Sequence, residues 1–215
     1  FYGAVAASTD LLSPRIRYGY VHRITRVLFR RALPALTAVA TTGGADPVHS
    51  PREGRAELTC ALATDDLEVG GIGSVIEALA AALPTAGVRP VVVCRGDGPR
   101  AGRLRASGVE VRDIAVSGDA AALRDVDIVE LHSAPASVEA AAIAGRLPLV
   151  TVMHNTEIHF TRRRWADLRA LLRRSEVGVA VSETVRGFHA RRLPPEVVAR
   201  LRVVPNGAPA PPPAT

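Results

Sequence analysis

The chain has 215 residues, a formal net charge of +6, and a composition that is 47% hydrophobic. A chain of this length and apolar content can bury a full single-domain core, which excludes disorder throughout. The basic balance favours anionic partners such as phosphate groups or acidic lipid surfaces. Aromatic residues make up only 4%, too few for the stacking of single-stranded bases, so we expect no nucleic-acid partner.

The first 55 residues differ from the rest in their pattern of residue types. Over 15–31, apolar residues recur at roughly helical spacing with arginines between them, which predicts a basic amphipathic helix. Such a helix either attaches to a membrane surface or packs, solvated, on the main domain. Residues 30–40 weakly resemble a signal peptide, and 41–54, rich in Gly and Pro, are typical of a linker. We therefore expect a basic extension and linker over 1–55.

From residue 57 onwards, strand-like and helix-like segments alternate. Strands are predicted over 58–64, 90–95, 109–114, 127–131, 149–153, 177–181 and 201–204. Helices are predicted over 72–86, 100–106, 136–144, 164–174 and 183–192. Parallel strands need long crossovers, so this alternation predicts a doubly wound, mostly parallel α/β sheet of Rossmann type, with helices on both faces, over 56–208. Residues 209–215, almost all Pro and Ala, predict an extended tail.

Two cysteines, Cys60 and Cys94, lie in apolar strand-like runs without metal-binding spacing. We expect them to be buried free thiols in a reducing compartment, and no zinc site. No apolar run approaches the roughly 20 residues needed to span a bilayer. These features favour a cytoplasmic protein, with attachment to the inner membrane face left open.

Small polar motifs end five of the predicted strands. In open parallel sheets, ligands bind outside the carboxyl ends of the strands, so these motifs outline one crevice. They are Asp65-Asp66 before Gly70-Gly71-Ile72-Gly73, then His132-Ser133, His154-Asn155, Ser182-Glu183 and Asn206-Gly207.

The glycine-rich turn precedes an Ala-rich helix. Glycines at a helix start let a ligand approach the backbone, and the free N–H groups favour a phosphate; alternatively, the glycines serve only the turn. As a nicotinamide fingerprint the turn is defective, because Ile76 stands where the third glycine belongs. An NAD(P)-binding oxidoreductase module, with Arg95 meeting a 2′-phosphate, stays open as an alternative.

The two strand-end histidines are the candidates for chemistry. An imidazole at the crevice can hydrogen-bond a sugar hydroxyl or transfer a proton near neutral pH, although a histidine at a strand end is often structural. The structural alternative has equal weight for His132, whereas His154 favours function because other polar groups flank it. His159 is either a substrate contact or solvated. Ser182 is first of all a helix N-cap, and Asn206-Gly207 a turn.

Taken in order, the five motifs resemble the amino-terminal half of glycosyltransferase family 4 over about residues 57–208. They are Gly70-Gly71-Ile72-Gly73, Glu130-Leu131-His132-Ser133, Thr151-Val152-Met153-His154-Asn155, Val179-Ala180-Val181-Ser182-Glu183 and Val203-Val204-Pro205-Asn206-Gly207. The resemblance implies one half of a GT-B architecture, in which two Rossmann-like domains face each other across a cleft.

The resemblance also implies a function. It implies transfer of a sugar, of hexosyl type, from a nucleotide-diphosphate-sugar to a small-molecule or lipid-linked acceptor, with retention and with neither metal nor other cofactor. Gly70, Gly71, Ile72 and Gly73 would approach the donor diphosphate, and His154 would be catalytic. His132, Ser133, Asn155 and Glu157 would bind the acceptor. No glutamate pair has the Glu-x7-Glu spacing of the second domain, so we expect inactivity without a carboxyl-terminal domain in cis or trans.

A third alternative is not catalytic. The run Arg162-Arg163-Arg164 would give a degenerate domain a basic surface for anionic lipid, although such a run is often simply solvated.

Overall fold

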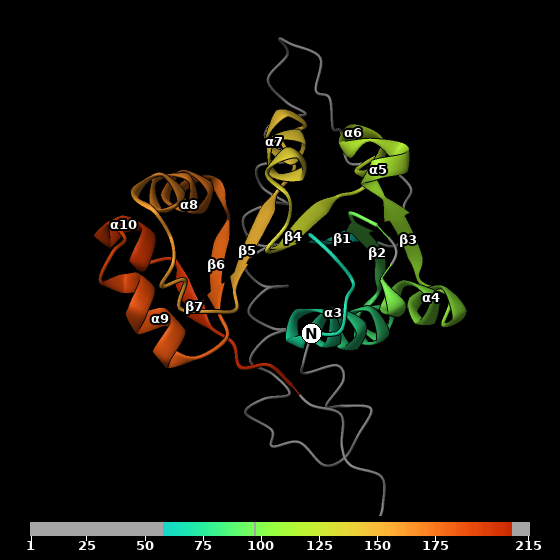
Figure 1. Cartoon of the computed structure of the whole chain (residues 1–215), viewed down its shortest axis with the longest axis horizontal. Coiled ribbons are helices and arrows are strands. Elements are labelled where there is room, and N and C mark those ends of the chain that lie inside the picture. Colours follow the sequence, from blue (N-terminus) through green and yellow to red (C-terminus); the bar gives the residue numbers. More distant parts are fainter. Residues whose placement is uncertain (1–57, 97, 208–215) are drawn as a thin grey trace, which may run out of the picture.

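The computed structural model describes residues 58–96 and 98–207, and every structural statement below refers to these (Figure 1). The predicted extension and linker over 1–55, with the predicted helix over 15–31, lie outside the described residues. So does the predicted tail over 209–215.

Seven parallel strands form one sheet, in the order β3-β2-β1-β4-β5-β6-β7. Their bounds are β1 Leu58–Thr64, β2 Val88–Cys94, β3 Glu110–Asp113, β4 Ile128–His132, β5 Leu149–Met153, β6 Val177–Ala180 and β7 Leu201–Val203. The predicted doubly wound sheet of Rossmann type is confirmed.

Two predicted strand ends move for reasons that the register explains. β2 begins at Val88, before the predicted residue 90, because Val88 and Arg89 pair with Leu58 and Thr59 of β1. β4 runs on to His132, which pairs with Thr64. His132 is therefore the last residue of a buried strand and not the first residue beyond it.

The helices fill the crossovers between strands. Their bounds are α3 Gly71–Ala82, η1 Leu83–Ala86 (a 3₁₀-helix), α4 Pro99–Ala106, α5 Ile114–Ser117, α6 Asp119–Ala122, α7 Ala136–Ala144, α8 Arg162–Arg174, α9 Glu183–Ala190 and α10 Pro195–Val198. The helix predicted over 72–86 is α-helical only to Ala82. Pro84 cannot donate a backbone hydrogen bond there, and Gly87, with a φ of 72°, ends the turn.

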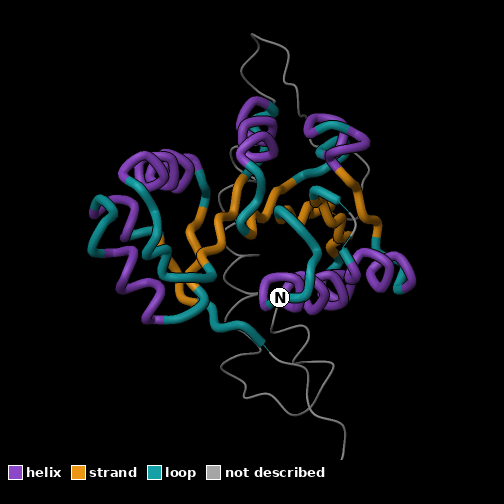
Figure 2. The backbone as a smooth tube through the Cα atoms, in the orientation of Figure 1, coloured by secondary structure: helices purple, strands orange, loops and turns teal. Residues whose placement is uncertain are grey.

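The helices cover both faces of the sheet (Figures 1 and 2). On one face, Leu62 of β1 packs with Ile76 and Leu79 of α3 and Leu104 of α4. On the other face, Ala61 and Ala63 pack with residues of α6, α7 and α8. Alternate β1 residues thus enter different cores, as expected for a sheet covered on both faces. Within the described ranges, no helix combines the length and apolar character needed to cross a bilayer.

The strand order reverses beside β1. The chain builds outward from β1 to β3, then returns to place β4 on the other side of β1. The Thr59 amide donates to Asp127 Oδ2 over 2.7 Å and helps to fix this return. Such a reversal opens a crevice between the loops that leave β1 and β4, which is where ligands of this fold bind.

Candidate active site

A cavity of about 490 Å³ lies at this reversal, at the carboxyl ends of the strands. Its wall comes from the loop after β1, the start of α3, and the ends of β4, β5 and β7. The lining residues are Thr64, Asp65, Asp66, Glu68, Val69, Gly70, Gly71, Ile72, Gly73, Ser133, His154, Asn155 and Asn206. Four of the five predicted motifs therefore meet here. Ser182 does not line this cavity: it caps α9, accepting from the Val185 amide at 3.1 Å.

Gly70 and Gly71 line the cavity where α3 begins. Gly70 is the N-cap, with extended backbone at a φ of −173°, and α3 has no acidic residue in its first turn. A Cβ added to either glycine would meet no protein atom within 4 Å. Neither strain nor packing among the described residues requires glycine at these two positions, so the backbone here is open to the cavity.

Gly73 has a different reason to be glycine. A Cβ there would lie 2.5 Å from Cδ of Arg100. The buried Arg100 side chain donates to the carbonyls of Glu68 and Gly70, both at 3.2 Å, and to Ser74 Oγ at 2.8 Å. It also forms an ion pair with Glu77. Arg100 thereby fixes the shape of the glycine loop, and Gly73 makes room for it.

The side chains that line the cavity are acidic. Asp65, Asp66 and Glu68 all line it, whereas none of its described lining residues is arginine or lysine. The Glu68 amide donates to Asp66 Oδ1 at 3.0 Å, and Arg95 lies 3.9 Å from Asp65 at an exposed position. A diphosphate at α3 would gain from the helix N-terminus. Further positive charge must come from outside the described lining.

His154 stands on the wall opposite the glycine loop. Its Nε2 lies 2.9 Å from Nδ1 of His132, and the two rings are tilted with centroids 5.1 Å apart. Burial, with the His132 charge adding to it, lowers the pKa of His154 to about 4. At neutral pH the imidazole is therefore uncharged and offers one donor and one acceptor nitrogen.

His132 lies behind His154 and has no exposed surface. It is not among the lining residues, so the structure places it behind the predicted acceptor pocket. Its Nε2 is 3.4 Å from Oε1 of Glu130, which is 2% exposed, and this contact falls short of hydrogen-bond geometry. Sequence reasoning gave Glu130 no role. The available signal was an acidic residue inside an apolar strand, a position that carboxylates rarely occupy without a partner.

Of the remaining predicted site residues, two line the cavity and one does not. Ser133 and Asn155 line the cavity as expected, and Ser133 does so with a φ of 56°, a left-handed conformation that turns the chain sharply after β4. Glu157, also at positive φ, is not among the lining residues, and burial raises the pKa of its carboxyl. Asn206, whose motif was predicted to border the crevice without a role beyond a turn, lines the cavity.

Two further expectations concern metals and thiols. Cys60 and Cys94 are buried, as predicted, and Cys94 Sγ donates to the Gly96 carbonyl at 3.4 Å. Among the described residues, no group of three or more His, Cys, Asp or Glu side chains is placed to hold a metal ion.

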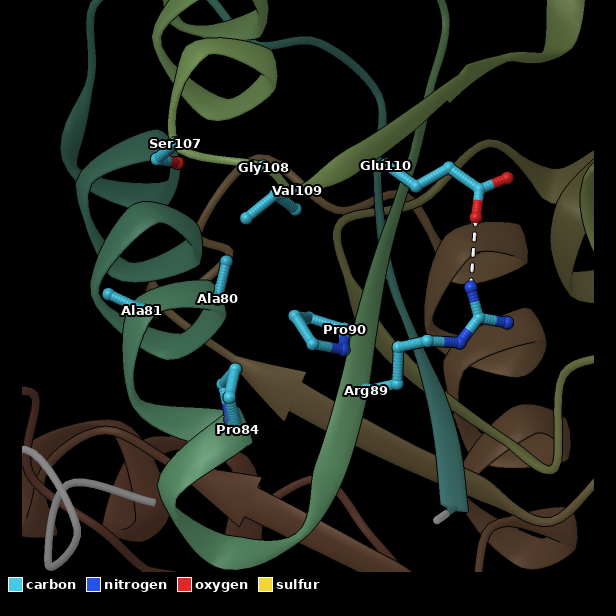
Figure 3. A pocket seen from close by; sticks show the side chains of 9 residues that line it. All are labelled: Ala80, Ala81, Pro84, Arg89, Pro90, Ser107, Gly108, Val109 and Glu110. Carbon is cyan, nitrogen blue, oxygen red and sulfur yellow. Dashed lines mark hydrogen bonds and ion pairs between the residues drawn. The ribbon is translucent and has the colours of Figure 1, made fainter. Parts of the chain in front are cut away.

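A second hollow, of about 430 Å³, lies at the opposite end of the sheet, between α3, η1 and the starts of β2 and β3 (Figure 3). Its only charged lining groups, Arg89 and Glu110, pair with each other at 3.0 Å. Ligands of this fold bind at the other end of the strands. The cavity at His154 is therefore the candidate active site.

The fold and the cavity together define an α/β protein of Rossmann type with its ligand site at the reversal of strand order. Residues 69–210 match the model of Glycosyltransferase Family 4. The chain therefore belongs to glycosyltransferase family 4, and its described part has the fold of an amino-terminal GT-B domain, as the motif order predicted. No curated protein was found to match the chain.

Solved structures support the fold. The chain is similar to HepE from Anabaena in complex with UDP-glucose, with 16% identity and a TM-score of 0.59, over 71% of this chain and 44% of HepE. It is also similar to HepE in complex with UDP and glucose, with 17% identity and a TM-score of 0.56, over 71% of this chain and 45% of HepE. This chain thus spans less than half the length of the HepE chains that it matches.

Proposed function

We propose that this chain supplies the acceptor-side half of a retaining enzyme that moves a hexosyl group from a nucleotide-diphosphate-sugar to an acceptor hydroxyl. The observation that carries the proposal is the pair Gly70 and Gly71. They line the cavity at the start of α3 with open space at each Cβ position, in a cavity that His154 also lines. Family membership favours sugar transfer over an NAD(P)-dependent oxidoreductase. We take residues 56–208 as the extent of the domain.

The proposed roles follow from position. The backbone N–H groups at the start of α3, from Gly70 to Gly73, receive the donor diphosphate. His154 is the catalytic residue and contacts the transferred sugar near the reacting carbon. Ser133 and Asn155, on the same cavity wall, bind the acceptor. Catalysis then consists mainly of positioning and of stabilising the departing diphosphate.

The acidic lining of the cavity implies that a second domain supplies the positive charge for the leaving diphosphate. The described lining contributes three carboxylates and no cation, which opposes the build-up of negative charge on a leaving diphosphate. The cationic groups must come from a carboxyl-terminal GT-B domain, in cis or in trans. HepE, more than twice as long as its matched region, bound UDP-glucose in the crystal.

The reaction needs no resident metal in this proposal, because the helix N-terminus and the second domain stabilise the diphosphate. The donor nucleotide-sugar is a substrate, and no other cofactor takes part. EDTA should therefore leave the rate unchanged.

We also propose peripheral contact with an anionic membrane on the cytoplasmic side, the face where a nucleotide-sugar donor is available. α8 carries six arginines and one acidic residue. Arg162, Arg163 and Arg164 are exposed at its N-terminus, where positive charge opposes the helix dipole. Helix stability does not explain these arginines, whereas an anionic surface does. The acceptor is then small or lipid-linked.

The test compares the chain alone with the chain combined with a family-4 carboxyl-terminal domain. A panel of nucleotide sugars is assayed for nucleoside diphosphate release, and NMR gives the anomeric configuration of the product. We expect no turnover by the chain alone and retaining turnover by the combination. His154→Ala should lower the rate by about a hundredfold or more.

The control is His159→Ala, since His159 is exposed and is not among the residues lining the cavity. Robust turnover by the chain alone would contradict the need for a second domain. Failure of the combination with every nucleotide sugar would contradict the proposed function.

A further inference from the structure

Glu130, His132 and His154 form a line of three polar side chains from the sheet interior to the cavity. Glu130 and His132 are the third and fifth residues of β4, so both point to the same face of the sheet, and His154 follows β5. The contacts are 3.4 Å from Glu130 Oε1 to His132 Nε2 and 2.9 Å from His132 Nδ1 to His154 Nε2. Only His154 reaches the cavity.

This line fixes how protons are distributed between the two rings. A nitrogen lone pair that faced a carboxylate at 3.4 Å in a buried site would be repelled, so the ring nitrogen nearest to Glu130 is the favoured place for a proton, although the contact falls short of hydrogen-bond geometry. With Glu130 in its ionised form, the carboxylate accepts and cannot donate, which places that proton on His132 Nε2. In the singly protonated ring of His132, Nδ1 then carries a lone pair and accepts from His154 Nε2–H.

The far nitrogen of His154 completes the chain. With its pKa near 4, the His154 imidazole is neutral at physiological pH and carries one proton. When Nε2 holds that proton, Nδ1 holds a lone pair. Among the residues that the structure describes, Nδ1 has no hydrogen-bond partner. It is the ring nitrogen left for a ligand.

We propose that Glu130 and His132 are positioning residues that hold His154 in the tautomer protonated on Nε2, so that its Nδ1 accepts a hydrogen bond from a substrate hydroxyl. The identity of that hydroxyl, on the transferred sugar or the acceptor, rests on the proposed function. The tautomer itself does not. The opposite tautomer would present an N–H to the cavity and would favour an anionic oxygen of the ligand. Glu130 and His132 therefore favour a ligand that places a neutral hydrogen-bond donor next to His154 Nδ1.

The tautomer is measured without any activity. Long-range ¹H–¹⁵N correlation spectra of the ¹⁵N-labelled full chain show which ring nitrogen of each histidine carries the proton. We expect His154 to be protonated almost wholly on Nε2. Finding the proton on Nδ1 would overturn the proposal.

Three substitutions at two residues test the positioning. Glu130→Leu removes the acceptor and should convert His154 to a mixture of tautomers, whereas Glu130→Gln keeps an acceptor oxygen and should largely restore the Nε2–H form. His132→Leu should have the same effect as Glu130→Leu and covers the case in which that variant does not fold. His159→Gln is the control for assignment. An unchanged His154 tautomer in both leucine variants would refute the roles of Glu130 and His132.

A kinetic measurement separates this inference from the proposed function. In the enzyme combined with its second domain, Glu130→Leu should lower kcat by about tenfold or more while the KM for the donor changes little. A tenfold rise in KM with an unchanged kcat would count against a role of Glu130 in positioning His154. If no sugar is transferred at all, the spectra still decide the tautomer.

Discussion

At the residue scale, the glycines of the loop differ in their surroundings. Gly70 and Gly71 have open space where a side chain would begin, and Gly73 has the Arg100 side chain there. Packing against Arg100 therefore requires glycine at position 73, whereas the proposed donor site would require it at positions 70 and 71.

Substitution by alanine should therefore affect ligand binding at positions 70 and 71, and protein stability at position 73. Gly70→Ala and Gly71→Ala should leave the free energy of unfolding within about 0.5 kcal/mol of wild type, because the added methyl meets nothing. They should weaken the binding of UDP-sugar in the combined enzyme. Gly73→Ala should cost about 1–3 kcal/mol through overpacking against Arg100.

Urea denaturation and calorimetric titration check the two effects. Loss of stability in the Gly70 and Gly71 variants, with binding intact, would show that the glycines serve the turn alone. The sequence left that alternative open.

His154 could be found from the sequence, because a polar motif that follows an apolar run marks a strand end. The roles of Glu130 and His132 could not. Their importance comes from burial and from the 2.9 Å contact between the His132 ring, at the end of β4, and the His154 ring, just after β5, and a linear pattern reports neither. Asn206 was placed at the crevice but received no binding role, since its turn signal accounted for it without a ligand.

At the scale of elements, periodicity predicted what is long and regular. β1, β5 and α7 have the predicted bounds, because each is an apolar or Ala-rich segment with polar or turn-forming residues at its ends. α5, α6 and α10 were not predicted, since four residues are too few to show a helical period.

At the same scale, the connection between α3 and α4 runs through Glu77 of α3. Arg100 of α4 and Arg103 of α4 both contact Glu77 of α3, but the Arg100 side chain is 11% exposed and that of Arg103 is 59% exposed. Only Arg100 also holds the Glu68 and Gly70 carbonyls. The two arginines are thus a matched pair for substitution.

Arg100→Leu should destabilise the chain by about 2–3 kcal/mol, because it leaves Glu77 and two loop carbonyls without their buried partner. Arg103→Leu should cost about 0.5 kcal/mol, as for an exposed ion pair. Thermal unfolding of the two variants gives the comparison. Equal losses would mean that the arginine does not fix the loop.

At the scale of the whole molecule, charge is unevenly placed within the part that the structure describes. The candidate active site has three acidic lining residues, whereas the N-terminus of α8 carries consecutive exposed arginines. Of these two regions, the proposed contact with an anionic surface would involve α8 and not the cavity.

Co-sedimentation with vesicles tests this distribution. The chain should bind vesicles rich in phosphatidylglycerol at low salt and should lose binding near 0.5 M salt, as the Debye length shortens. Substituting glutamine for Arg162, Arg163 and Arg164 together should weaken binding by about a hundredfold, at about 1 kcal/mol per arginine. Substituting Arg95, Arg124 and Arg146 removes the same charge elsewhere and should have a smaller effect. Equal effects of the two triple variants would exclude α8 as the contact.

Since β4 returns to pair with β1, the cavity has walls drawn from both ends of the described chain, Thr64 at one and Asn206 at the other. Contacts of such long sequence separation form late during folding, because the chain between them must first be ordered. During synthesis, the glycine turn and the first βαβ unit will have emerged well before β5 brings His154 to the same edge. Binding competence is thus a property of the finished sheet, and a nascent chain halted before β7 would lack a complete pocket.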